Sequence, residues 1–207
     1  NPMKGKTMKT QHIQIGMIPA ILYGEPAQRG YLFLHGQMGH KEEAAAFALI
    51  ACPQGYQVLS IDLPGHGERQ NRDEVFTPWT AVPDIQAALY WSKQHWKTVS
   101  LRANSIGAYF AMLALDTPRR ALLVSPIVDM ERLILTMMGW AGVSEEQLKE
   151  QGEIATSFGQ TLSWTYLCWV REHPVHHWDC PICILYGSGG QYDSPSYCGR
   201  VYSSTQC

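Results

Sequence analysis

The chain has 207 residues, of which 45% are hydrophobic and 16% charged, an ordinary globular composition with room for one sizeable core. Sixteen Lys and Arg against eighteen Asp and Glu leave a formal charge of -2, which argues against nucleic acid as a partner. No run approaches the roughly 18 apolar residues that span a bilayer, and no apolar signal segment follows the N-terminus, so we expect a cytoplasmic protein with no membrane partner.

Short apolar runs alternate with longer mixed segments from residue 11 onward. This rhythm predicts an α/β protein with a mostly parallel, doubly wound sheet, and the closeness of the first two runs predicts an antiparallel start. The predicted strands span 12–15, 18–23, 31–34, 58–61, 99–101, 121–124 and 182–186. The predicted crossover helices, in which apolar residues recur at helical spacing, span 41–51, 79–96 and 105–115.

Residues 129–178 interrupt this rhythm. One helical stripe in this segment contains Met130, Leu133, Ile134, Met137 and Met138. Tryptophans follow without a strand pattern between them, so we expect a helical cap inserted into a single domain that spans 11–207. Such a stripe is more often ordinary core than a binding wall, although its composition suits an apolar acyl or aryl group.

Ser105 lies where a predicted strand runs directly into a predicted helix. In Ala103-Asn104-Ser105-Ile106-Gly107, small residues stand two positions before and two positions after the serine. A sharp strand-to-helix turn requires them because it presses two backbones together. Such a turn exposes the serine hydroxyl and aims the helix N-terminus at a developing oxyanion. A serine before a helix is just as often an N-cap, so both interpretations stay open here.

Two upstream strands also end in glycine-rich turns. The run H-G-Q-M-G at 35–39 follows a buried strand, and the Gln37 backbone N–H is our candidate to share an oxyanion hole with that of Ile106. The alternative is that this run only shapes a tight turn. In the run D-L-P-G-H-G that begins at Asp62, we interpret Asp62 and His66 as structural residues.

In order and spacing, H-G-x-x-G, D-x-P-G-H-G and A-N-S-x-G resemble the motifs of the α/β-hydrolase family of serine esterases, lipases and related acyl hydrolases. The resemblance covers residues 11 to about 188. It implies that Ser105 is the nucleophile of a serine hydrolase that acts on a small-molecule carboxylic ester or thioester through an acyl-serine intermediate, with no cofactor or metal. Two alternatives remain: another reaction on this scaffold, such as carbon–carbon bond or peptide hydrolysis, and a disabled scaffold that only binds ligands.

The family pattern fails near the end of the chain. The family's acid commonly follows a pattern similar to L-Y-G-S-x-D, but Gly190 stands where this aspartate is expected, and residues 189–207 show no helix or strand period. A shift of the reading frame near Gly189 would encode a sequence that resembles the family's acid loop. We therefore expect a tail foreign to the fold, with the last strand, the last helix and the catalytic histidine missing.

This expectation leaves two candidate acids, Asp129 and Asp193. Asp129 follows a predicted strand, and Asp193 is a candidate by proximity alone. We favour a different role for Asp129, as the N-cap of a helix that begins at Met130. A sheet edge left uncovered by a missing strand also favours self-association.

Overall fold

A seven-stranded sheet forms the centre of the computed structural model, which describes residues 8–186. Its spatial order is β1-β2-β4-β3-β5-β6-β9. The strands are β1 (Thr10–Ile15), β2 (Ile18–Tyr23), β3 (Arg29–Leu34), β4 (Tyr56–Ile61), β5 (Thr98–Asn104), β6 (Ala121–Val124) and β9 (Ile182–Leu185). β2 pairs antiparallel with β1 and with β4, and all other neighbours are parallel. The predicted α/β class, the antiparallel start and the mostly parallel sheet are confirmed.

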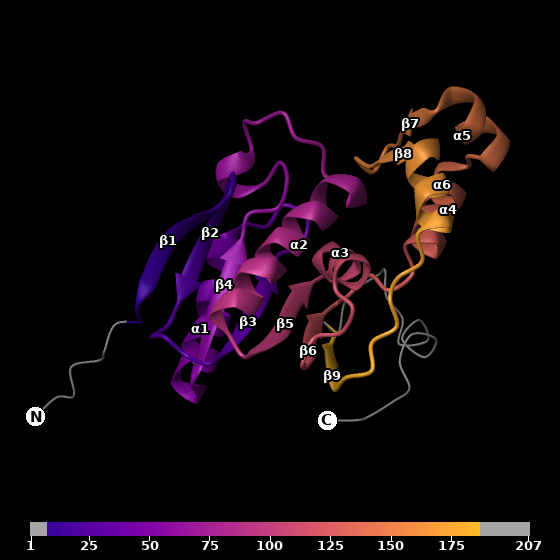
Figure 1. The fold of residues 1–207 in the computed structure, drawn as a ribbon. Coiled ribbons are helices and arrows are strands. Elements are labelled where there is room, and N and C mark those ends of the chain that lie inside the picture. Colours follow the sequence, from indigo (N-terminus) through magenta and orange to yellow (C-terminus); the bar gives the residue numbers. More distant parts are fainter. Residues whose placement is uncertain (1–7, 187–207) are drawn as a thin grey trace, which may run out of the picture.

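Helices cover both faces of this sheet (Figure 1). They are α1 (Ala44–Ala51), α2 (Pro78–His95) and α3 (Ile106–Ala114), with short 3-10 turns η1 (Lys41–Glu43), η2 (Cys52–Gln54) and η3 (Gly67–Arg69). Successive side chains of a strand point to opposite faces. Tyr31 and Phe33 of β3 pack with α1, whereas Leu32 and Leu34 pack with α2 and α3. β3 is therefore buried on both sides, as a doubly wound sheet requires.

The segment between β6 and β9 forms a separate group of short elements, which Figure 1 shows beyond α3 and away from α1. It contains α4 (Met130–Ala141), α5 (Glu145–Gln151), β7 (Glu153–Ala155), β8 (Thr161–Ser163) and α6 (Trp164–Glu172). The expected helices are present, but the expectation of no strand here was wrong, because β7 and β8 form an antiparallel hairpin. Strands of three residues are too short to show an alternating pattern in the sequence.

β9 is the last strand of the described sheet, at the edge opposite β1. Leu185 in this strand exposes 60% of its surface. The atypical tail at 189–207 and the candidate acid Asp193 lie outside the described residues. The missing final elements and self-association at this edge therefore stay predictions. Between residues 8 and 186, no helix has both the length and the apolar character needed to cross a membrane.

The indole of Trp96 lies directly on the backbone of β3. A Cβ added to Gly30 would lie 1.9 Å from the indole ring, so only glycine leaves room for it. The ring is 4% exposed, and its Nε1–H donates a hydrogen bond to Gln57 Oε1 at 3.0 Å. Gly30 therefore lets one side chain join the end of α2 to the strands β3 and β4.

We predict that Gly30→Ala lowers the free energy of unfolding by about 2–3 kcal/mol, because it overpacks this contact and displaces a hydrogen-bonded indole. Urea unfolding followed by circular dichroism measures the change. Gly139→Ala is the matched control, since a Cβ there meets no atom within 4 Å. In helix α4 that change should stabilise the protein by up to about 1 kcal/mol. Equal effects of the two substitutions would contradict the role given to Trp96.

Candidate active site

Ser105 occupies the turn between β5 and α3 in a strained conformation. Its φ is 48° and its ψ is -121°, which a residue with a side chain rarely adopts. Two backbone bonds to the β6 side hold it there. The Ser105 N–H donates to the Val124 carbonyl oxygen at 2.9 Å, and the Ser105 carbonyl oxygen accepts from the Ile127 N–H at 3.2 Å. The surrounding chain therefore imposes the turn.

The Ser105 side chain is not used to cap the helix. Ser105 stands at the N-cap position of α3, but its side chain makes no capping hydrogen bond. The interpretation of this serine as an ordinary N-cap is therefore wrong for the hydroxyl group. The residue borders a large cavity instead.

Glycines let the start of α3 approach the end of β3. A Cβ on Gly107 would lie 2.4 Å from the His35 carbonyl oxygen, which no side chain tolerates. A Cβ on Gly36 would lie 3.3 Å from the Cβ of Ser105. The turn that carries Gln37 is thus pressed against Ser105, which explains the need for a small residue two positions after the serine.

Two backbone donors flank this serine. Within residues 8–186, the N–H groups of Gln37 and Ile106 make no hydrogen bond to the protein. Ile106 is the first residue of α3, where a helix leaves its N–H groups without internal partners. Both residues border the same cavity as Ser105. The structure therefore brings together the three residues that the sequence analysis named.

The cavity has a volume of about 1030 Å³ and lies between the sheet and the segment 130–172. Four members of the stripe identified in the sequence line it from α4, namely Met130, Leu133, Ile134 and Met137, whereas Met138 is buried in the core. Arg132, Thr136 and Trp140 of α4 also border the cavity. The lining from other elements includes Val75, Phe76, Thr77, Trp79, Phe158, Leu162 and Tyr166. A largely apolar hollow with a few polar groups is typical of a small-molecule site.

Asp129 also borders this cavity and begins α4. Its carboxylate accepts a hydrogen bond from the Arg132 backbone N–H at 3.0 Å, which confirms the expected N-cap. A carboxylate that acts as the acid of a catalytic triad orients a histidine. No histidine is among the described residues that border the cavity.

Two aromatic residues of the cavity wall were missed in the sequence. The rings of Trp79 in α2 and Tyr166 in α6 lie 5.7 Å apart, so they join the cap to the core. The Tyr166 hydroxyl is buried and has no hydrogen-bond partner among the described residues. Burial raises the pKa of Tyr166, and the neighbouring Tyr109 adds to the rise. Tyr166 therefore stays protonated at neutral pH. Neither ring belongs to a motif that a sequence pattern would reveal.

Asp62 and Lys41 form a buried ion pair beneath the site. Lys41 Nζ lies 2.7 Å from Asp62 Oδ2, and the Lys41 backbone N–H donates to Asp62 Oδ1 at 2.8 Å. Burial opposes the charge of Lys41, but hydrogen bonds to Asp62, Glu68 and Glu42 outweigh it and raise the lysine's pKa. The structural interpretation of Asp62 is confirmed, because its carboxylate joins the loops after β3 and β4.

His35 joins the same two loops and is fully buried. Its Nε2 accepts a hydrogen bond from the Leu63 backbone N–H at 3.0 Å, and its Nδ1 lies 2.7 Å from the Gly36 carbonyl oxygen. Because a carbonyl only accepts, Nδ1 carries the proton and the ring is neutral. Burial is the main reason that the pKa of His35 falls from 6.5 to about 4. Both ring nitrogens are therefore occupied by structural bonds.

This pKa shift predicts a loss of stability in mild acid. An unfolded histidine takes up its proton near 6.5, whereas the lowered pKa of folded His35 is about 4. Between these values the unfolded chain binds more protons, so the free energy of unfolding falls as the pH drops, by about 3 kcal/mol from this group. Urea unfolding at a series of pH values measures the slope. His35→Gln, which keeps an acceptor toward Leu63, should flatten it; an unchanged slope would contradict the assignment.

The strain at Ser105 predicts a difference in stability between two variants of this residue. Glycine adopts φ near 48° without penalty, whereas alanine keeps the strain of the native turn. We expect Ser105→Gly to exceed Ser105→Ala in free energy of unfolding by about 1 kcal/mol. Thermal and urea unfolding of the two variants measure this difference. A less stable glycine variant would show that the turn is relaxed.

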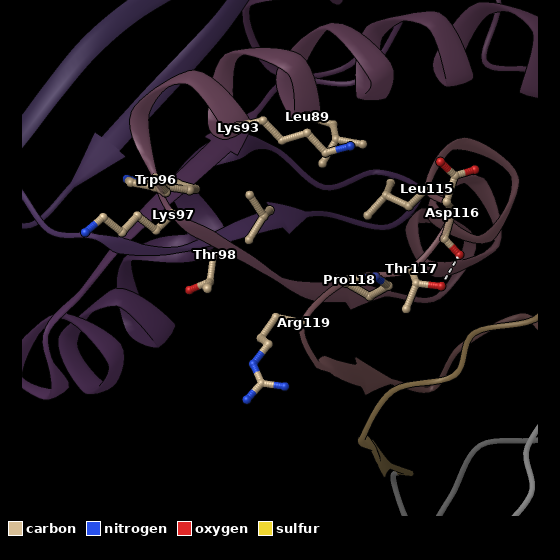
Figure 2. Close-up of a pocket in the computed structure, with 11 residues that line it drawn as sticks. Leu89, Lys93, Trp96, Lys97, Thr98, Leu115, Asp116, Thr117, Pro118 and Arg119 are labelled. Atoms are coloured by element: carbon tan, nitrogen blue, oxygen red, sulfur yellow. Dashed lines mark hydrogen bonds between the residues drawn. The ribbon is translucent and has the colours of Figure 1, made fainter.

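A second hollow, of about 310 Å³, lies at the opposite end of the sheet, where β5 and β6 begin (Figure 2). Figure 2 shows Lys93, Lys97 and Arg119 extending in different directions, so their charges do not converge on one point. The Thr117 hydroxyl there donates to the Asp116 carbonyl oxygen at 2.6 Å. This hollow is remote from Ser105, which follows the other end of β5, and offers no built anion site.

Among the described residues, no group of three or more His, Cys, Asp or Glu side chains is placed to hold a metal ion.

The chain also resembles known proteins. The sheet order, the serine turn and the inserted segment together define an α/β-hydrolase. A family model described as serine aminopeptidase, S33, matches residues 26–188. The chain therefore belongs to this family of hydrolases. No curated protein matches it significantly.

Several solved structures share the fold. Est1E from Butyrivibrio proteoclasticus, solved with ferulic acid bound, is 18% identical with a TM-score of 0.63, and the match covers 84% of this chain and 77% of that one. An esterase from Pyrococcus furiosus is 13% identical with a TM-score of 0.63, over 93% and 75% of the two chains. A thioesterase domain from the curacin biosynthetic pathway is 17% identical with a TM-score of 0.55, over 93% and 88%.

Proposed function

We propose that the chain is a serine hydrolase of carboxylic esters or thioesters. The observation that carries the proposal is the strained turn at Ser105. This residue borders a cavity of about 1030 Å³. A strained residue persists only where the surrounding structure holds it, and such residues cluster at active sites. The esterase and thioesterase activities named for structures of the same fold support this reaction class.

In this proposal the Ser105 hydroxyl attacks the carbonyl carbon of the substrate. The carbonyl oxygen becomes an oxyanion, and the N–H groups of Gln37 and Ile106 donate hydrogen bonds to it, helped by the N-terminus of α3. The alcohol or thiol leaves with the proton that the serine hydroxyl gives up, and water then hydrolyses the acyl-serine to the carboxylic acid and free Ser105. The apolar stripe of α4 in the cavity wall favours an acyl or aryl group of similar character.

A second candidate function is ligand binding with little turnover. It is favoured by the absence of a histidine from the cavity lining within residues 8–186. Of the histidines nearest the serine turn, His35 and His66 already have both ring nitrogens within hydrogen-bonding distance of backbone groups. A serine hydroxyl without a base is a poor nucleophile, so an oxyanion hole alone supplies only part of the acceleration.

Hydrolysis of p-nitrophenyl butyrate separates the two functions. We expect turnover above background that disappears in Ser105→Ala, and stimulation by added imidazole, because the cavity has room for a small base supplied from solution. Release of p-nitrophenol followed by absorbance measures both. Mass spectrometry should find the butyryl group on Ser105 of the native chain.

Three outcomes distinguish the candidates. Loss of activity and of the acyl adduct in Ser105→Ala supports the hydrolase. Binding of the ester without turnover, with or without imidazole, supports the ligand-binding scaffold. Activity that survives in Ser105→Ala contradicts the role proposed for this residue. Thr117→Ala is the control, because a substitution far from the cavity should leave the activity unchanged.

A further inference from the structure

His66 is bound to the turn that carries Gln37, although it does not border the cavity. Its Nε2 accepts a hydrogen bond from the Met38 backbone N–H at 3.0 Å, and its Nδ1 lies 2.8 Å from the Pro64 carbonyl oxygen. The carbonyl accepts, so Nδ1 carries the proton and Nε2 is the acceptor. The ring is 9% exposed and lies 4.3 Å from the ring of Phe76. The acceptor atom is thus held in place by its surroundings.

The bond to His66 supports a residue in an unfavourable conformation. The Gly39 N–H donates to the Gly36 carbonyl oxygen at 3.1 Å, and Met38, the third residue of this turn, has a φ of 62°. These are the marks of a type II turn, which normally has glycine or asparagine at that position. The Met38 side chain is 89% exposed, so its packing does not compensate for the strain.

A turn with a methionine at this position favours type I, in which the central peptide is rotated by about 180° and both φ values are negative. Rotation would turn the Met38 N–H away from His66 and break the bond between them. The hydrogen bond therefore selects one of two orientations of the peptide that follows Gln37. Gly36, the first residue of this turn, packs against Ser105, so the bond from Met38 to His66 fixes a turn that contacts the serine.

We infer that His66 is a positioning residue, which fixes the turn at 36–39 through the Met38 N–H and thereby holds the Gln37 N–H where it can donate to an oxyanion formed on Ser105. This inference rests on the proposed function, since an oxyanion hole matters only if Ser105 is acylated. On this inference, a side chain outside the cavity fixes the position of one of the two N–H donors that border it.

Two substitutions of His66 separate its hydrogen bonds. Glutamine places an acceptor where Nε2 stands and keeps the bond from Met38, whereas asparagine places a donor near Nδ1 and keeps only the bond to Pro64. Phenylboronic acid is the probe, because it forms a tetrahedral adduct with a serine hydroxyl and sets an oxygen in the hole. Its affinity is measured by tryptophan fluorescence, together with kcat and KM for p-nitrophenyl butyrate, and circular dichroism confirms that each variant folds.

We expect His66→Asn to weaken phenylboronic acid binding by about ten- to a hundredfold and to lower kcat with KM changed less than about twofold, since the lost interaction belongs to the transition state. His66→Gln should stay within about threefold of the native protein. Adding Met38→Gly to His66→Asn should restore most of the affinity, because glycine holds a φ of 62° without the bond.

A third variant tests the turn without touching His66. Met38→Val loses little packing because residue 38 is exposed, but a β-branched side chain resists a positive φ, so the variant should bind phenylboronic acid several-fold more weakly. Equal losses in both His66 variants, with no recovery on adding Met38→Gly and no effect of Met38→Val, would overturn the inference. Failure of the native protein to bind phenylboronic acid through Ser105 would overturn the proposed function, and the inference with it.

Discussion

The buried ion pair between Asp62 and Lys41 is the interaction on which the site depends. Asp62 is fully buried and accepts hydrogen bonds from the Lys41 N–H, the Lys41 ammonium group and the Glu68 N–H. Removing one partner from such a pair leaves an uncompensated charge and typically costs about 3–5 kcal/mol. The loops after β3 and β4 are therefore held together as one unit. Gly67 belongs to the same unit, because a Cβ there would lie 2.1 Å from the Asp62 carboxylate.

Two histidines form hydrogen bonds between these loops, one from each loop to the backbone of the other. His35, at the end of β3, accepts from the Leu63 N–H after β4, and His66, after β4, accepts from the Met38 N–H after β3. Each ring thus accepts a hydrogen bond from a backbone donor of the other loop. Each bond also depends on a neutral ring. His35 and His66 thus hold the loops beside Ser105, and both nitrogens of each ring are already engaged in hydrogen bonds.

The sequence predicted the sheet, its helices and the serine turn because each leaves a local pattern. Apolar runs located every strand of the main sheet, and the small residues around Ser105 signalled a close approach that Gly107 accounts for. The hairpin β7–β8 left no such pattern, since its strands are too short. The cavity wall at Trp79 and Tyr166 and the bond from His66 to Met38 depend on how distant segments meet, which periodicity does not encode.

The bonds that hold the serine turn come from one part of the molecule. Ser105 is held by backbone groups of Val124 and Ile127, and the turn at 36–39 by its own bond and by His66. Within the described chain, none of these bonds involves residues 130–172, which nevertheless form much of the cavity wall. The serine turn and much of the cavity wall are thus formed by separate stretches of the chain. Another insert between β6 and β9, arising in evolution or by design, could replace this part of the wall and leave the bonds of the serine turn in place.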